Sequence, residues 1–341
     1  EIEDLIQFAT WPSTEDRFSS IGEFLAALDK AEEALEDALT APASPLTSPL
    51  DANAGNELNG FEVIRRLGKG GTSLALDVRR KNAGQPRQGV LKIALEPEYN
   101  DRLKREAETL VRLQPHQNIV QCHERFELAG LTTLFLSSAG EETLRERLRQ
   151  ETRLGLDLLQ RFGEELISVV DYLEREGVPH RDIKPDNIGI RPGSGKRLTL
   201  TLFDFSLAGV PANDLNAGTR VYLDPFLRKR GMWDGYAERY SCALTLYEMA
   251  TGTLPEWGDG SADPATLTAE ITLDSERFDA SIRKQALAFF AKALARDHRK
   301  RFEMPEVLPP HRRRSSFSSL HSTVICVMMS GVMGWSSCRW K

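Results

Sequence analysis

Apolar residues recur along the middle of the chain at two spacings, which predict strands first and long helices afterwards. Strand-like apolar runs lie at 61–67, 90–93, 117–120, 131–137 and 198–203. Helical spacing, with apolar residues three and four positions apart, covers 101–113, 156–176, 240–250 and 281–294. Strands therefore dominate the first half of this region, and helices dominate the second.

The same patterns divide the chain into parts. Residues 1–40 are mostly helical in pattern, and residues 41–58, rich in Ala, Pro, Ser, Thr and Asn, predict a flexible linker. Residues 59–303 contain the strand and helix patterns described above. Residues 304–341 show neither period, so we expect an irregular tail there.

Composition narrows the class of protein without identifying a partner. The chain has 341 residues, 40% of them hydrophobic and 28% charged, as in soluble globular proteins. Its net charge of −6 gives no reason to expect nucleic-acid binding, and no apolar run is long enough to span a membrane. The cysteines lack metal-ligand spacing, which favours reduced thiols in a cytoplasmic protein. The chain begins at Glu1 instead of Met, so we expect a piece of a longer protein.

One polar stretch, His180-Arg181-Asp182-Ile183-Lys184-Pro185-Asp186-Asn187, carries the strongest chemical signal. Asp182 can accept the proton of an attacking hydroxyl, and Lys184 can neutralise a moving phosphoryl group. Asn187 can hold magnesium together with Asp204, which follows the strand-like run at 198–203. These groups are what phosphoryl transfer from a metal-bound nucleotide requires.

A second candidate lies upstream, where a strand-like run enters Gly68-Lys69-Gly70-Gly71-Thr72-Ser73. Glycines let backbone N–H groups approach phosphate oxygens, which a Cβ atom would obstruct. The alternative is an ordinary hairpin turn. The position just before the other motifs favours nucleotide binding.

The stretch at 180–187, followed by Asp204-Phe205-Ser206, resembles the catalytic loop and the D-F-G motif of eukaryotic-like serine/threonine protein kinases, as found in bacteria. The resemblance covers about residues 60–303, with the motifs in family order. It implies an α+β, two-lobed protein kinase fold. The small β-rich N-lobe would lie at about 59–138 and the larger helical C-lobe at about 139–303.

The resemblance also implies site residues, with ATP and Mg²⁺ as cofactors and a protein as substrate. Asp182 would be the catalytic base, Lys184 would neutralise phosphate, and Asn187 and Asp204 would bind magnesium. Lys92 would contact the phosphates and pair with Glu106, Glu108 being the less favoured partner. The implied nucleotide-binding residues are Leu67, Gly68, Gly70, Ser73, Ala75, Val90 and Lys92.

Each of these residues has a plainer structural interpretation. Asp182 could cap a turn, Asn187 could lie in a tight bend, and Lys92 with Glu106 could be a surface ion pair. Each alternative is credible by itself. It is not credible that all of them hold at once for residues that occur in the order of the family's motifs.

Several positions depart from the family pattern. Ser206 replaces the glycine of D-F-G, and Asp224-Pro225-Phe226 replaces Ala-Pro-Glu, so we expect Arg301 to lose its usual glutamate partner. Glu238 stands where an aspartate normally holds the catalytic loop. Gly189 stands where a larger apolar residue usually forms the floor of the adenine pocket.

The activation segment between Asp204 and Phe226 is short. No Ser, Thr or Tyr lies between Ser206 and Thr219. We therefore expect activity without phosphorylation of this segment, and we expect Thr219 to contact the catalytic loop.

These features predict a serine/threonine protein kinase. The alternative from another class is a pseudokinase that binds nucleotide and acts as a scaffold or switch. Ser73, Ser206 and Phe226 keep that alternative open. A small-molecule kinase is disfavoured by Lys184-Pro185 and by Gly218-Thr219.

Both ends of the chain allow two interpretations. Residues 1–40 contain Arg17-Phe18 before an amphipathic run, as Arg301-Phe302 ends the kinase region. They are either the end of an upstream kinase-like domain or a simple N-terminal helix. For 304–341, we favour out-of-frame or disordered sequence over a basic regulatory tail. A narrower resemblance is to large multidomain bacterial kinases of phage-defence systems.

Overall fold

The computed structural model of the chain describes residues 18, 20–40, 48–81, 87–193, 195, 197–260 and 262–302. They belong to two compact units, Glu1–Ala52 and Asn53–Lys341. The interpretations of residues 41–47 and of the tail at 304–341 fall outside the described residues.

The described part of the first unit contains helix α2, Ile21–Thr40, and a 3-10 turn, Pro49–Asp51. The Ser20 hydroxyl accepts a hydrogen bond from the Glu23 amide at 3.2 Å, the contact that their capping-box spacing predicts. The rings of Phe18 and Phe24 meet edge to face. In the part of the helix whose side chains the structure describes, the large apolar residues Ile21, Leu25 and Leu28 are exposed.

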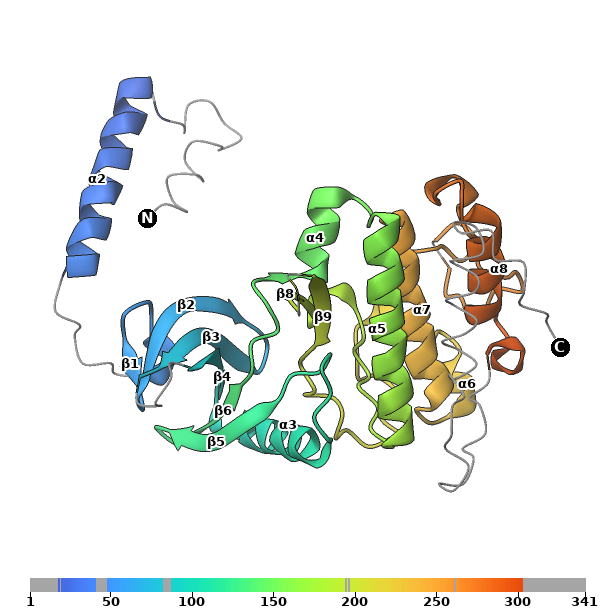
Figure 1. The fold of residues 1–341 in the computed structure, drawn as a ribbon, viewed down its shortest axis with the longest axis horizontal. Helices are drawn as coiled ribbons and strands as arrows, with labels where there is room; N and C mark the ends of the chain where they lie inside the picture. The colour runs from blue at the N-terminus through green and yellow to red at the C-terminus, as the bar shows by residue number, and fades with distance from the viewer. Residues whose placement is uncertain are drawn as a thin grey trace. The chain divides into compact units, whose positions relative to one another are not determined.

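The second unit starts with an antiparallel sheet whose described strands follow the order β1-β2-β3-β4-β6-β5 (Figure 1). Their bounds are Glu57–Leu58 (β1), Phe61–Lys69 (β2), Ser73–Arg80 (β3), Arg87–Ala94 (β4), Cys122–Leu128 (β5) and Leu131–Leu136 (β6). Apolar residues two positions apart share one face of a strand, and that face is buried. Such pairs include Phe61 and Val63, Leu74 and Leu76, and Leu91 and Ile93.

Helix α3, Asn100–Arg112, packs against β5 and β6. The buried residues Leu103, Ala107 and Leu110 form the apolar face that the spacing predicts. The Asn100 side chain donates to the Gly130 carbonyl at 2.8 Å and accepts from the Thr132 amide at 2.7 Å. These bonds fix the start of α3 to the turn between β5 and β6.

The prediction of a strand at 117–120 is wrong. The strand that pairs in the sheet is Cys122–Leu128 instead. Its charged residues keep it from standing out as an apolar run in the sequence. Residues 118–120 pair with the second lobe: the Val120 amide donates to the Leu202 carbonyl at 3.1 Å, and the Leu202 amide donates to the Asn118 carbonyl at 2.8 Å. The apolar character of this segment reflects burial between the lobes, since burial and strand pairing are separate properties.

The second lobe is mostly helical. A small sheet, β7-β8-β9, lies between the first lobe and helices α5 and α7, which run side by side (Figure 1). The bounds are β7 Glu142–Thr143, α4 Leu144–Glu151, α5 Leu156–Arg175, β8 Ile188–Pro192, β9 Leu198–Leu202, α6 Leu227–Arg230, α7 Gly235–Thr251 and α8 Arg283–Ala293. The predicted α+β, two-lobed fold is confirmed. None of the helices in the described residues combines the length and apolar character that crossing a membrane demands.

Helix α7 is the centre of this lobe, and nearly all of it from Ala237 onward is buried. Its buried hydroxyls have partners both inside and outside the helix: Thr245 donates to the Ser241 carbonyl, whereas Ser241 lies 2.8 Å from the Tyr222 carbonyl and 3.2 Å from the Ala237 carbonyl. Gly252 ends the helix with a positive φ of 78°, as its position predicts.

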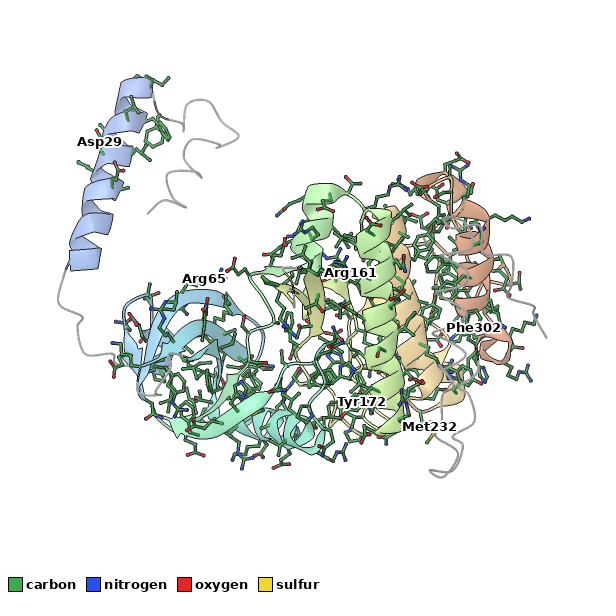
Figure 2. All side chains as sticks on the ribbon, in the orientation of Figure 1. Asp29, Arg65, Arg161, Tyr172, Met232 and Phe302 are labelled. Carbon is green, nitrogen blue, oxygen red and sulfur yellow. The ribbon has the colours of Figure 1, made fainter. Side chains whose placement is uncertain are left out.

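The two lobes are also tied at the far end of α5, where Tyr172 lies (labelled in Figure 2). The Tyr172 hydroxyl donates to the Gln114 carbonyl at 2.9 Å, in the segment that follows α3. The His116 ring stacks on Tyr172 with their centroids 5.0 Å apart. The end of α3 is thereby held against the helical lobe.

Arg301 has lost its usual glutamate partner, as expected, but another carboxylate takes that place. Arg301 donates to both carboxylate oxygens of Asp224, at 2.6 and 3.2 Å. Arg230 Nη2 lies 2.8 Å from the same carboxylate. Asp224 is 3% exposed and Arg301 4%, so the acid at 224 replaces the glutamate expected two positions later. Phe226, freed from that role, packs edge to face on Trp257.

We predict that Asp224→Asn lowers the free energy of unfolding by about 3–5 kcal/mol, because it leaves the buried guanidinium group of Arg301 without its counter-charge. Urea denaturation at neutral pH measures this. Arg299→Met is the matched control, because its partner Asp297 is on the surface, and should cost less than about 1 kcal/mol. A loss for Asp224→Asn as small as that of the control would contradict the assignment.

Candidate active site

The catalytic-loop candidate follows α5, which ends before Gly177 with its positive φ of 65°. The Asp182 carboxylate lies at its centre, with a side chain 12% exposed. One oxygen accepts from the Thr219 amide at 2.9 Å and from the Thr219 hydroxyl at 2.7 Å. The other accepts from Asn187 Nδ2 at 2.8 Å and lies 2.8 Å from Lys184 Nζ. Thr219 contacts this loop, as expected.

These neighbours keep Asp182 ionised. Burial by itself would raise its pKa, but hydrogen bonds from Lys184 and Thr219 outweigh burial and hold the pKa below its usual value. Lys184 Nζ also donates to the Thr219 hydroxyl at 2.5 Å. Lys184 therefore links the carboxylate to the activation segment.

His180 connects the catalytic loop to the strand that carries Asp204. It is fully buried, and its Nδ1 accepts from the Asp182 amide at 3.2 Å, so its Nε2 donates to the Phe203 carbonyl at 3.0 Å. Burial lowers the pKa of His180, which favours the neutral ring that this pattern needs. Its ring also meets Phe205 edge to face.

Glu238 accepts hydrogen bonds that hold the catalytic loop, which is the role expected for the acidic residue at this position. Its Oε1 accepts from the Arg181 amide at 2.7 Å and from Trp233 Nε1 at 2.9 Å. Arg181 has a positive φ of 70°, an uncommon conformation for a residue with a Cβ atom. Burial of Glu238 raises its pKa to about 7 although N–H donors oppose the shift.

The ammonium group of Lys92 lies where three elements meet. Nζ donates to both Glu106 oxygens, at 2.7 and 2.8 Å, and to Asp204 Oδ1 at 2.7 Å. Burial opposes the charge of Lys92, but Asp204 and Glu106 more than offset burial and raise its pKa. The less favoured partner, Glu108, instead lies 3.4 Å from Arg125 on the surface.

Asp204 is also held in an uncommon backbone conformation, with φ of 63°. Burial would raise its pKa, but the charge of Lys92 outweighs burial and keeps its pKa far below the usual value. The Asn187 amide nitrogen is used by Asp182, which leaves the Asn187 amide oxygen for a ligand. An ionised carboxylate and an amide oxygen fit Mg²⁺, which often takes one or two protein oxygens plus phosphates. In the described residues, no group of three His, Cys, Asp or Glu could hold a metal.

The residues predicted to bind nucleotide lie in adjoining strands. Ala75 pairs with Gly68 on one side and with Lys92 on the other, so the three share a sheet face. Val90 shares it as well, two residues before Lys92. Leu67 occupies an irregularity between the pairs formed by Arg66 and Gly68.

The turn between β2 and β3 is a hairpin, as the alternative interpretation of the glycines proposed. The Gly70 amide donates to the Ser73 carbonyl at 2.9 Å. A Cβ added at Gly68 or Gly71 would meet no atom within 4 Å. The turn therefore faces open space, which also suits a bound phosphate.

Position 189 has to be a glycine because the segment that joins the two lobes passes close to it at Ala139. A Cβ there would lie 2.4 Å from the Ala139 carbonyl oxygen and 2.7 Å from the Ala139 Cβ. This segment rests directly on β8 at this point. A larger apolar residue at 189 would have to displace it.

Sequence reasoning missed a charged cluster beside the catalytic loop. Arg145 on α4 contacts Glu248 on α7 and the Tyr222 hydroxyl, and its Nε lies 3.2 Å from Asp186. These residues are up to 103 positions apart, and only Asp186 lies in the stretch at 180–187 that the sequence marks as functional. No signal in the sequence could have joined them.

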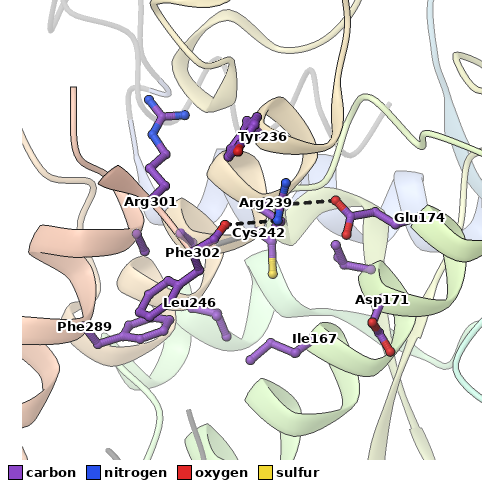
Figure 3. Close-up of a pocket in the computed structure, with 13 residues that line it drawn as sticks. Ile167, Asp171, Glu174, Tyr236, Arg239, Cys242, Leu246, Phe289, Arg301 and Phe302 are labelled. Carbon is purple, nitrogen blue, oxygen red and sulfur yellow. Dashed lines mark hydrogen bonds and ion pairs between the residues drawn. The ribbon is translucent and has the colours of Figure 1, made fainter. Parts of the chain in front are cut away.

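An apolar cavity in the second lobe, between α5, α7 and α8, is unrelated to this chemistry (Figure 3). Arg239 crosses it, 3.2 Å from Glu174 Oε1 and 3.0 Å from the Phe302 carbonyl. Its volume of about 40 Å³ is far below the several hundred Å³ of small-molecule sites. It is a packing gap.

Comparisons with known proteins agree with the fold and the motifs. A model of the protein kinase domain matches residues 61–311. The chain is 41% identical to the probable kinase PglW of Streptomyces coelicolor, over 91% of this chain and 22% of that protein. It is 27% identical to the serine/threonine-protein kinase PknJ of Mycobacterium tuberculosis, over 74% of this chain and 44% of PknJ. A plant relative, CBL-interacting serine/threonine-protein kinase 7 of Arabidopsis thaliana, is also 27% identical, over 74% of this chain and 58% of that kinase.

The chain therefore belongs to the protein kinase family, and its kinase domain is of the serine/threonine type. It is similar to PglW over most of its own length, but it spans only 22% of the length of that relative.

We predict that Glu238→Gln removes a pH-dependent part of the stability. The Glu238 pKa rises from 4.5 to about 7 on folding, so the folded protein binds this proton more tightly than the unfolded chain does between those values. Wild-type stability should therefore rise relative to the variant as the pH falls from 8 to 6, by about 1 kcal/mol. Urea denaturation of both proteins at each pH measures the difference, and the other titrating groups cancel. A constant difference would contradict the assignment.

Proposed function

We propose that this domain transfers the γ-phosphoryl group of ATP to a serine or threonine hydroxyl of a protein. The observation that carries the proposal is the position of Lys92 Nζ, 2.7 Å from Asp204 Oδ1 and within hydrogen-bond distance of both Glu106 oxygens. Three elements far apart in sequence thus converge on one ammonium group. The geometry suits a group that orients nucleotide phosphates.

Asp182 would act as the base. Its four acceptor positions are used by Thr219, Lys184 and Asn187. An incoming substrate hydroxyl would replace the Thr219 hydroxyl. Its proton would pass to Asp182 as its oxygen bonds to the γ-phosphorus, while the bond from that phosphorus to the bridging oxygen breaks and ADP leaves. Lys184 would then lie beside the charge that the phosphoryl group carries.

Asn187 and Asp204 would hold magnesium through their side-chain oxygens. When bound, the ion neutralises phosphate charge. The chain prepares for it by keeping Asp204 ionised and by turning the Asn187 amide nitrogen toward Asp182. The sheet face that carries Gly68, Ala75 and Lys92 would take the nucleotide.

We predict that Asp182→Ala lowers phosphate transfer about a hundred- to ten-thousand-fold, because the base is lost while the nucleotide contacts stay. Transfer from labelled ATP with magnesium to a basic protein acceptor measures the rate, and titration with ATP measures binding. Asp157→Ala, an exposed acid at the start of α5, is the control and should keep the rate.

The outcome separates the kinase from its alternative. Labelling that disappears in Asp182→Ala supports a working kinase. Binding of ATP without any transfer by the wild-type protein would favour a pseudokinase that serves as a scaffold or switch.

Activity without phosphorylation of the activation segment is supported by the contacts of Arg181. Its Nη1 donates to the Pro211 carbonyl at 3.0 Å, and its guanidinium lies over the Trp233 ring at 5.4 Å. The Trp233 amide in turn donates to the Ala212 carbonyl at 2.7 Å. The segment is thus tied to the catalytic loop by groups of the chain itself, and no phosphate is needed for these contacts.

We predict that phosphatase treatment leaves the rate of transfer unchanged within about twofold. Mass spectrometry before and after treatment would follow any modified site between Asp204 and Phe226. A required phosphorylated residue in this segment would contradict the proposal.

The setting of the domain is a further part of the proposal. The similarity to PglW covers only 22% of the length of that relative, which supports a place for this domain within a larger multidomain protein. We propose that residues 1–40 end an upstream kinase-like domain, which the capped helix α2 suits. Cytoplasmic location stays a prediction from the cysteines, and a role in phage defence stays a prediction from the narrower resemblance.

A further inference from the structure

A chain of hydrogen bonds, closed by one turn of α3, surrounds the candidate metal-binding aspartate, and Ser206 is part of it. Arg102 Nη2 donates to the Ser206 hydroxyl at 3.2 Å. That hydroxyl belongs to the second residue after Asp204, and a hydrogen bond from it helps to lower the pKa of the Asp204 carboxylate. Asp204 accepts from Lys92, and Lys92 donates to Glu106. Arg102 and Glu106 are four residues apart on α3 and therefore lie on one face. These five residues are called the Ser206 ring.

The ring depends on a hydroxyl at position 206. A serine hydroxyl can accept one hydrogen bond and donate another, so it can join Arg102 to Asp204. A glycine, which the D-F-G pattern has here, would leave both groups without this partner. It would also leave the backbone after Asp204 freer.

Arg102 is placed mainly by this contact. In the described part of the chain, its Nε is buried and has no hydrogen-bond partner. An unsatisfied buried donor is unfavourable, so the bond from Nη2 to Ser206 has to hold the guanidinium there. Removal of the hydroxyl would release the Arg102 side chain.

The segment around Ser206 is held at both sides. Phe205 is fully buried and contacts the His180 ring, and the Ala208 amide donates to the Phe205 carbonyl at 3.0 Å. Farther on, a Cβ at Gly209 would lie 3.4 Å from the Arg105 Cβ. The backbone on either side of Ser206 thus already lies close to α3 and the catalytic loop, which presents the hydroxyl to Arg102.

We propose that Ser206 is a positioning residue that holds Asp204 and α3 together, in the arrangement in which Lys92 contacts both Asp204 and Glu106. The link from Arg102 through Ser206 to Asp204 acts in parallel with the link through Lys92. This inference rests on the proposed kinase function. It implies that restoring the family's glycine weakens the enzyme.

The test uses the full chain with Ser206→Ala, Ser206→Gly, Ser206→Thr, Arg102→Met and the double variant Ser206→Ala/Arg102→Met. Arg112→Met, an exposed arginine in the last turn of the same helix, is the matched control. The readouts are kcat, the Mg²⁺ concentration for half-maximal rate at saturating ATP, and the melting temperature without ATP or metal.

We expect Ser206→Ala, Ser206→Gly and Arg102→Met each to raise the half-maximal Mg²⁺ concentration and lower kcat, by about tenfold in total, the effect of losing a charge-assisted hydrogen bond. The double variant should be no worse than either single variant, in rate and in melting temperature, because both changes break one link. Ser206→Thr, which keeps the hydroxyl, and Arg112→Met should resemble wild type.

An unchanged or faster Ser206→Gly enzyme would overturn the proposal, as would additive effects in the double variant. If Ser206→Gly does not fold, Ser206→Ala decides, because it removes the hydroxyl without adding backbone freedom. If wild type transfers no phosphate, the kinase proposal fails separately. The ring is then tested by ATP binding with and without Mg²⁺, where Ser206→Ala must weaken only the Mg²⁺-dependent part.

Discussion

Lys92 is only 9% exposed, and a charge so far withdrawn from water must be paired. Its partners are Glu106 on α3 and Asp204, the second residue after β9, so both lobes must be in place before the charge is satisfied. The apolar face of α3, the bonds of Asn100 to the turn between β5 and β6, and the contact of Tyr172 with Gln114 all serve this requirement. Each of them helps to place α3, which carries Glu106.

Where the chain departs from the family pattern, a residue at a nearby position can supply the group that is missing. The carboxylate expected at 226 is supplied at 224 and takes the same arginine, Arg301. Phe226 can then contact Trp257, an apolar environment that a glutamate would not suit. At position 189 the family's larger side chain is absent and nothing nearby replaces it, because the segment at Ala139 that joins the two lobes fills the space that a side chain would need.

The catalytic loop is held by backbone contacts more than by exposed charges. Glu238 accepts from the Arg181 amide, His180 bridges Asp182 and Phe203, and Arg181 is stacked on Trp233. Buried hydrogen bonds of this kind are costly to break singly, because each leaves a polar group unsatisfied. The uncommon φ values of Arg181 and Asp204 persist because such contacts over-determine them.

The sequence by itself determined the class of protein, because Asp182, Lys184 and Asn187 lie within one loop and the apolar period of α3 and α5 is local. The partner of Lys92 could be named for the same reason, as Glu106 lies on the next predicted helix. Only the tertiary structure decided the partner of Arg301 and the contact of Ser206 with Arg102. It also decided that the strand expected at 117–120 lies at Cys122–Leu128 (β5) instead. A periodic pattern reports which face of a segment is buried, but it does not report what covers that face. Asp224 and Arg301 are 77 residues apart, and only the packed chain brings them together.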